Sequence, residues 1–208
     1  MEKGRIIIPI VSVLALAGII AVIVITTGKD KRFTLPDKND IRGEIQNLGY
    51  KVSEFDLGKE EYKKIGINLD INELYLDKNN KNDPDTQYNI LIAVYPDADM
   101  AYEGFNNYYS SAWYLQNKSD LNGNIKMYED DKKHKGYIFY DGISLNNEGF
   151  VSGYAFSQSA GDLFNQRDYN YLYGGIYCDN NRIVVITTTD KNNRYKIQDI
   201  LEKYELPM

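Results

Sequence analysis

The sequence predicts an α+β fold, in which an N-terminal transmembrane helix precedes an antiparallel sheet with helices on one face. Three observations lead to this prediction. An uncharged apolar run lies near the N-terminus, two later strands are almost continuously apolar, and each of these strands is followed by a helix that an aspartate can cap. About 175 residues follow the apolar run, which is enough for one domain with a sizeable core.

The apolar run has the length of a membrane-spanning helix. No charged side chain lies between Arg5 and Lys29. Wound as a helix at about 1.5 Å per residue, residues 6–27 are about 33 Å long, which matches a hydrocarbon core of roughly 30 Å. We therefore expect a short tail at 1–5, a transmembrane helix at 6–27 in contact with the lipid bilayer, a polar tether at 28–37 and a soluble domain at 38–208.

Three other interpretations of this run fit less well. A cleaved signal peptide has a shorter apolar region, of about 7–15 residues, and an A-x-A-like site, whereas this run ends I-T-T-G-K. A lipoprotein needs a cysteine directly after the run, and the only cysteine is Cys178. A type IV pilin carries a glutamate at the position that Pro9 occupies here.

The orientation of the anchor follows less directly from charge. Basic residues flank both ends of the run in similar numbers, so the positive-inside rule is nearly balanced. An N-terminal apolar segment before a folded domain most often acts as a signal anchor, so we expect the domain to lie outside the cytoplasm. The abundance of Lys, Asn, Ile and Tyr is typical of low-GC Gram-positive bacteria.

The charge of the domain argues against nucleic acid as a partner. Residues 33–208 contain 19 Lys or Arg and 28 Asp or Glu, a net charge near −9. Such a field repels phosphate backbones. The single cysteine cannot form an intrachain disulfide, so the fold depends on packing.

The elements of the domain follow from local patterns. A helix is expected over 40–48, with Asp40 as its cap and Gly49 as its stop. Strands are expected at 50–57 and 72–78, and a hairpin at 124–142. The Gly/Ser/Asn-rich stretch 143–162 contains one further short strand, at 153–158, and the role of this stretch is not predicted.

Two units repeat the order strand, strand, helix. In the first, the apolar strand 87–95 leads to a helix at 97–115, capped by Asp97 or Asp99. In the second, strands at 172–178 and 182–188 flank the turn D-N-N, and Asp190 caps a final helix. We interpret the units as two related ββα halves, for which a ferredoxin-like arrangement, single or doubled, is the favoured topology.

The sequence predicts no catalytic residue, metal site or cofactor. His134, the only histidine, lies in a charged hairpin tip, where we expect a solvated turn residue. Cys178 is expected to be an inert, partly buried thiol. The oxygen-rich stretch 77–86 departs from the EF-hand pattern and is interpreted as a hairpin loop. Phosphate-binding glycine motifs and nucleophile-elbow motifs are absent from the sequence.

Aromatic residues give the candidate binding site. Tyr102, Tyr109 and Trp113 repeat along one stripe of the helix at 97–115, beside the stripe expected to face the sheet. If exposed, they form a flat surface suited to a sugar, peptide or protein; otherwise they belong to the core. Tyrosines at period two between 169 and 177 raise the same two alternatives.

The leading functional hypothesis is a single-pass, membrane-anchored domain outside the cytoplasm that binds or scaffolds, with a cell-wall or protein partner. Two alternatives remain open at this point. One is an anchored envelope enzyme that uses acidic residues. The other is a subunit of a membrane complex whose domain faces the cytoplasm.

Overall fold

The computed structural model describes residues 33–56, 59–64, 66, 69–78, 83–84, 88–145 and 171–208. Phe33–Met208 form one compact unit. The predicted transmembrane helix at 6–27 and the predicted strand at 153–158 lie outside the described residues, as does most of the oxygen-rich loop. Within the described ranges, no helix combines the length and apolar character that crossing a bilayer requires.

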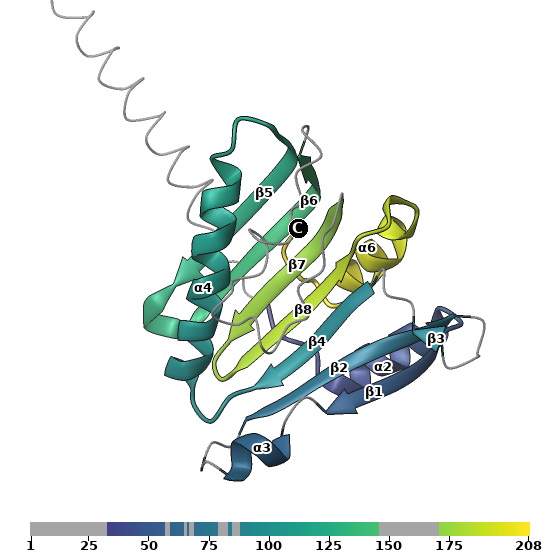
Figure 1. Cartoon of the computed structure of the whole chain (residues 1–208), viewed down its shortest axis with the longest axis vertical. Coiled ribbons are helices and arrows are strands. Elements are labelled where there is room, and N and C mark those ends of the chain that lie inside the picture. The colour runs from purple at the N-terminus through teal and green to yellow at the C-terminus, as the bar shows by residue number, and fades with distance from the viewer. Residues whose placement is uncertain are drawn as a thin grey trace, which may run out of the picture. The chain divides into compact units, whose positions relative to one another are not determined.

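The described strands form one antiparallel sheet (Figure 1). Along the sheet the order is β1-β2-β4-β8-β7-β6-β5, and β3 pairs with β2 away from this path. The strands are β1 (Lys51–Asp56), β2 (Asp70–Lys78), β3 (Asp83–Pro84), β4 (Tyr88–Val94), β5 (Leu121–Asp130), β6 (Lys135–Leu145), β7 (Leu172–Asp179) and β8 (Arg182–Thr188). The α+β class is therefore confirmed.

Helices cover both faces of this sheet, so the prediction that they share one face is wrong. α4 (Ala98–Gln116) packs on one face, while α2 (Lys38–Asn47) and α6 (Arg194–Lys203) pack on the other (Figure 1). Each face has its own hydrophobic core. The reason lies in β4 and β8, whose continuous apolar runs supply side chains to both cores. In a sheet with one face exposed to water, apolar and polar residues would alternate along each strand.

The ferredoxin-like topology is also wrong. That arrangement, built from two split βαβ units, places its helices on one face of the antiparallel sheet, whereas α4 and α6 here cover opposite faces of a sheet with the order β1-β2-β4-β8-β7-β6-β5. The order strand, strand, helix is present twice, as β2-β4-α4 and β7-β8-α6, with the short β3 intervening in the first unit. α4 and α6 nevertheless lie on opposite faces, so the two units are not copies of one packing arrangement.

The first described helix starts slightly earlier than the sequence predicts. The cap of α2 is Asp37, whose carboxylate accepts a hydrogen bond from the Asp40 backbone N–H at 2.8 Å. Asp40 completes a capping box by accepting from the Asp37 N–H at 3.1 Å. Ile41 and Ile45 are fully buried, and Gly49 follows the helix with a φ of +88°. Asp40 thus contributes to the cap from the third helical position.

The predicted Asp97 cap of the long helix is confirmed, whereas Asp190 caps a short turn instead of the last helix itself, whose N-cap Asn193 makes no side-chain cap hydrogen bond. Asp97 caps α4 by accepting from the Met100 N–H at 2.8 Å. Asp190 caps a short 3-10 turn, Lys191–Asn193, that leads into α6. Between β7 and β8 the chain turns at Asn180, which adopts a φ of +54°. Two further short helices are α3 (Lys59–Lys64) and the 3-10 turn Asp131–Lys133 between β5 and β6.

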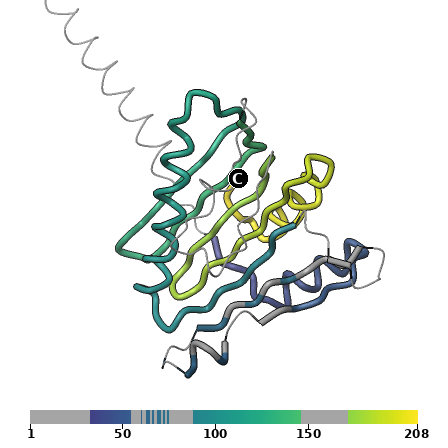
Figure 2. The backbone as a smooth tube through the Cα atoms, in the orientation of Figure 1, coloured from purple at the N-terminus to yellow at the C-terminus, as the bar shows by residue number. Residues whose placement is uncertain are grey.

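Residues 33–37, which the sequence places in the tether, pack against the sheet face that α2 and α6 cover. In Figure 2 the purple trace that leads into α2 passes behind the strands. Phe33 and Leu35 are buried there, and Phe33 makes edge-to-face contacts with Tyr137 and Tyr177. The folded unit consequently starts at Phe33.

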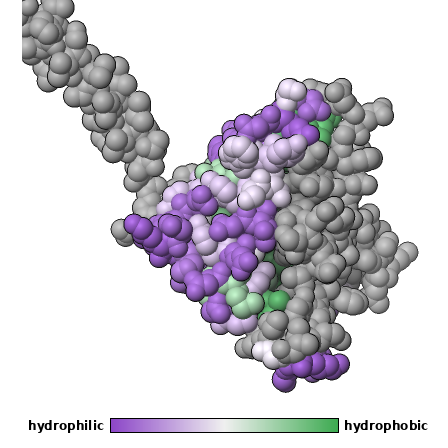
Figure 3. Space-filling view, turned by 60° about the vertical axis from the view of Figure 1, so that its left-hand side comes forward, coloured by the Kyte–Doolittle hydropathy of each residue, from purple (hydrophilic) through white to green (hydrophobic). Residues whose placement is uncertain are grey.

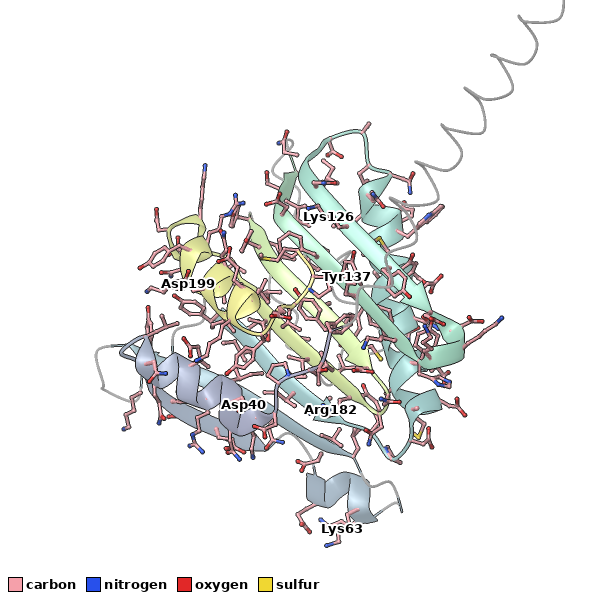
Figure 4. The ribbon with its side chains drawn as sticks, turned by 180° about the vertical axis from the view of Figure 1, so that it is seen from behind. Asp40, Lys63, Lys126, Tyr137, Arg182 and Asp199 are labelled. Carbon is pink, nitrogen blue, oxygen red and sulfur yellow. The ribbon has the colours of Figure 1, made fainter. Side chains whose placement is uncertain are left out.

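Two cations hold this segment in place, and we call the arrangement the N-terminal clasp. Lys135 donates to the Phe33 carbonyl at 2.5 Å, lies 4.3 Å from the centre of the Phe33 ring and pairs with Asp179 at 3.2 Å. Arg182 donates to the Leu35 carbonyl at 3.2 Å. Figure 4 shows this face of the sheet, with Tyr137 on β6 and Arg182 on β8.

Candidate functional site

The second half of α4 carries two of the four large hydrophobic side chains that are exposed among the described residues. The stripe that faces the sheet is fully buried, as the sequence predicts, and comprises Ala101, Phe105, Tyr108, Ala112 and Leu115. The opposite side carries what we call the outer stripe of α4. Its members are uncharged polar or aromatic residues: Asn107, Ser110, Trp113, Tyr114 and Asn117.

Two large aromatic side chains of this stripe are exposed to solvent. Trp113 is 59% exposed and Tyr114 is 54% exposed. Residues 104–117 contain no charged side chain, although 26% of all residues in the chain are charged. Figure 3, in which this side of the molecule comes forward, shows pale and hydrophilic atoms with only small hydrophobic areas. The surface is therefore amphipathic rather than a broad apolar patch.

The structure separates the three residues of the predicted binding stripe. Trp113 is exposed, Tyr109 is half-buried, and Tyr102 is only 8% exposed. The Tyr109 ring packs against Phe105 with a centroid distance of 6.0 Å and belongs to the margin of the core. The three side chains therefore do not form one flat exposed surface.

Tyr102 is held by groups of the β5–β6 hairpin. Its hydroxyl donates to Glu129 at 3.5 Å, and its ring meets the His134 ring edge-on at 5.6 Å. Burial, and secondarily the Glu129 carboxylate, raise the pKa of Tyr102 to about 12. This tyrosine remains a neutral packing residue at physiological pH.

Tyr114 does not belong to the predicted binding stripe. It lies four positions after Ser110 and therefore on the side of the helix opposite the buried stripe. The helical spacing alone is therefore enough to place Tyr114 on the outer side of α4. Its ring also lies 5.1 Å from the Lys118 ammonium, directly beyond the end of α4.

The hairpin tip brings His134 and Cys178 together, although not as a catalytic pair. The His134 ring pairs with Asp99 at 2.7 Å, and its side chain is about one-third exposed, so it is less solvated than expected. The Cys178 thiol lies 3.7 Å from the His134 backbone carbonyl instead of its ring. Burial raises the pKa of Cys178 to about 12, which keeps the thiol protonated and unreactive at neutral pH.

The tyrosines of β7 belong to the core. Tyr173 and Tyr177 are buried on the face that α2 and α6 cover, and the Tyr177 hydroxyl donates to the Pro207 carbonyl at 3.0 Å. Tyr171 packs beside them, and Tyr169 lies outside the described residues. Because Tyr173 and Tyr177 are buried, these two tyrosines do not form a second aromatic binding surface.

Several carboxylates of the described residues are engaged in structural contacts. Asp179 pairs with Lys135, and Asp141 lies 2.9 Å from Arg194. The Arg194 guanidinium also lies over the Tyr173 ring. Glu54 pairs with both Lys38 and Arg42. Throughout the described ranges, no group of three or more His, Cys, Asp or Glu side chains is placed to hold a metal ion.

The outer stripe of α4 is thus the candidate functional site, because it combines exposed aromatic rings with hydroxyl and amide groups on one rigid helix. Its chemistry suits recognition of a neutral, hydrogen-bonding surface rather than bond cleavage. Comparison with family models, curated proteins and solved structures finds no match for this chain, so the candidate site depends on geometry alone.

Proposed function

We propose that this protein is a single-pass membrane protein whose folded domain lies outside the cytoplasm and acts as a binding or scaffolding module. Residues 6–27 serve as the membrane anchor in this proposal. The outer stripe of α4 is the binding surface, and its partner is a cell-wall component or another protein.

The observation that carries the proposal is the exposure of Trp113 and Tyr114 on an uncharged stretch of helix. Large aromatic side chains contribute most of the energy at many interfaces, because they bury much area and lose little conformational entropy. Among the residues whose side chains the structure describes, most aromatic rings belong to the two cores or pack against them. Two adjacent rings left in solvent therefore favour a binding role.

The first experiment tests the surface in intact cells. A photo-crosslinking amino acid replaces Tyr114, and the same replacement at Tyr195 on α6 is the matched control, since Tyr195 is 58% exposed. We expect a discrete adduct from position 114 and none of that size from position 195. Adding Trp113→Ala should remove the adduct, while the thermal midpoint of the variant should stay within about 2 °C, because exposed substitutions seldom change stability by more than about 0.5 kcal/mol.

Either of two results would contradict this binding surface. One is an adduct that persists with Trp113→Ala, and the other is equal labelling at positions 114 and 195. A large fall in the thermal midpoint would instead assign Trp113 a structural role.

The second experiment tests the membrane orientation. A peptide tag follows Met208 in the full chain, and external protease is applied to intact protoplasts. Loss of the tag before lysis supports a domain outside the cytoplasm. A tag that survives until lysis would place the domain inside and would favour a subunit of a membrane complex.

A further inference from the structure

Charge is distributed along α4 in a way that is complementary to itself. Glu103 is exposed in the first half of the helix, and Lys118 follows its C-terminal end. Between them lies the uncharged outer stripe. Glu103, Asn107, Ser110, Tyr114 and Lys118 are spaced by four, three, four and four residues, so the helical positions share one side.

This arrangement fits an antiparallel pair of α4 helices related by a two-fold axis. When the axis passes beside Ser110 and Ser111, Glu103 of one copy lies opposite Lys118 of the second copy, and Asn107 lies opposite Tyr114. The same contacts occur again at the other end, because a two-fold interface uses one surface twice. The small side chains at the axis permit two helices to approach closely.

The net charge of the domain favours this face over others for self-association. Two copies that each carry a charge near −9 repel one another, and like charges facing each other across an interface are costly. Residues 104–117 present no charge to a second copy. The acidic and basic residues that flank them attract in the antiparallel arrangement.

We propose that the outer stripe of α4 is a self-docking surface, through which two membrane-anchored copies of this chain form a two-fold, antiparallel α4–α4 contact. The inference rests on the proposed function, because it names the partner at that same surface. A single helix pair buries less area than a stable soluble dimer of standard size. Confinement of both copies to one membrane raises their effective concentration and compensates for the small area.

Disulfide crosslinking of the full chain in its own membranes tests the contact. Ser110→Cys places a thiol beside the two-fold axis, and the wild-type chain, whose Cys178 is fully buried, is the blank. Tyr195→Cys on α6 is the control for random collision, because positions 110 and 195 are both exposed. After mild oxidation we expect a band of twice the chain mass from Ser110→Cys, several-fold stronger than from Tyr195→Cys.

A charge exchange then distinguishes self-docking from other partners. In the Ser110→Cys chain, Glu103→Lys alone and Lys118→Glu alone should each reduce the dimer band several-fold, because each change places like charges opposite one another. The combination of both changes should restore the band, since each acid again faces a base. Such restoration is specific to a two-fold antiparallel pair.

Three results would overturn the proposal. They are equal dimer bands from Ser110→Cys and Tyr195→Cys, failure of the double charge exchange to restore the band, and an adduct of a mass other than twice the chain. The last result would leave the proposed binding function intact with a different partner. If, in addition, Trp113→Ala leaves the photo-crosslinked adducts unchanged, the binding function itself fails.

Discussion

At the scale of single residues, burial determines which chemically reactive groups can act. Cys178 and the His134 carbonyl meet at the hairpin tip, but the thiol is fully buried and its pKa is raised from its ordinary value of 9.0 to about 12. Because the thiolate is the nucleophile, this cysteine is protected both by sterics and by its protonation state. The single histidine and the single cysteine are thus parts of the packing between α4 and the hairpin.

Cys178 should therefore report unfolding. At pH 8 we expect a thiol reagent to leave the native chain unlabelled and to label it rapidly in denaturant. A raised pKa means that the folded state holds this proton more tightly. The stability from this group is present below about pH 9 and is lost as the pH rises towards 12.

The Ser110→Cys chain gives the control for reagent access, since position 110 is exposed and should gain one fast-reacting thiol. Fast labelling of Cys178 in the native wild-type chain would contradict the burial of this thiol.

At the scale of elements, the ends of the helices depend on individual side chains. In α2 Asp37 is the N-cap residue and forms a capping box with Asp40. The Asp37 carboxylate accepts a hydrogen bond from the Asp40 backbone N–H. Asp37→Ala removes that acceptor and leaves a backbone N–H without its partner. We expect the free energy of unfolding to fall by about 1 kcal/mol.

Urea denaturation measures this loss, and Asp37→Asn is the matched control, because asparagine is an equally good cap. Asp37→Asn should retain most of the stability. An equal loss in both variants would mean that the negative charge near the helix N-terminus, rather than the cap hydrogen bond, provides the stabilisation.

The elements also show what the sequence could and could not predict. The apolar spacing of α4 predicts its buried stripe correctly, because a period of 3.6 residues is a local property. Which face of the sheet a helix covers depends on the path of the chain and not on local pattern. The continuous apolar runs of β4 and β8 already contained the signal for two covered faces.

The candidate site likewise has one part that the sequence could predict and one part that it could not. The exposed position of Trp113 follows from the helical period, and Tyr114 could have been found in the same way. The burial of Tyr102 could not, because it depends on Glu129 and His134, which the β5–β6 hairpin brings to the helix from elsewhere in the chain. Contacts of this kind require the register between distant elements.

At the scale of the whole molecule, the N-terminal clasp decides where the folded unit starts. The segment 33–37 supplies two buried apolar side chains to the core, and Lys135 and Arg182 bind its carbonyls from β6 and β8. The clasp joins the first described residues to strands more than 100 positions later in the sequence. The core under α2 and α6 is incomplete without it.

Two truncated chains should consequently differ in stability. A chain that starts at Lys29 keeps the clasp, whereas one that starts at Lys38 loses Phe33, Leu35 and the Asp37 cap. Burial of each large apolar side chain contributes about 1.5–3 kcal/mol, so the shorter chain should lose several kcal/mol. That is a large part of the roughly 5–15 kcal/mol that keeps a typical domain folded.

Thermal and urea denaturation of the two chains measure this difference. The longer chain with Lys135→Met tests the clasp without truncation. This change removes the hydrogen bond to the Phe33 carbonyl and the cation that pairs with Asp179, and adding Asp179→Asn should restore part of the loss. Equal midpoints for the chains that start at Lys29 and Lys38 would show that residues 33–37 rest on the sheet without stabilising it. A lower midpoint for both the shorter chain and Lys135→Met would establish the clasp as part of the fold.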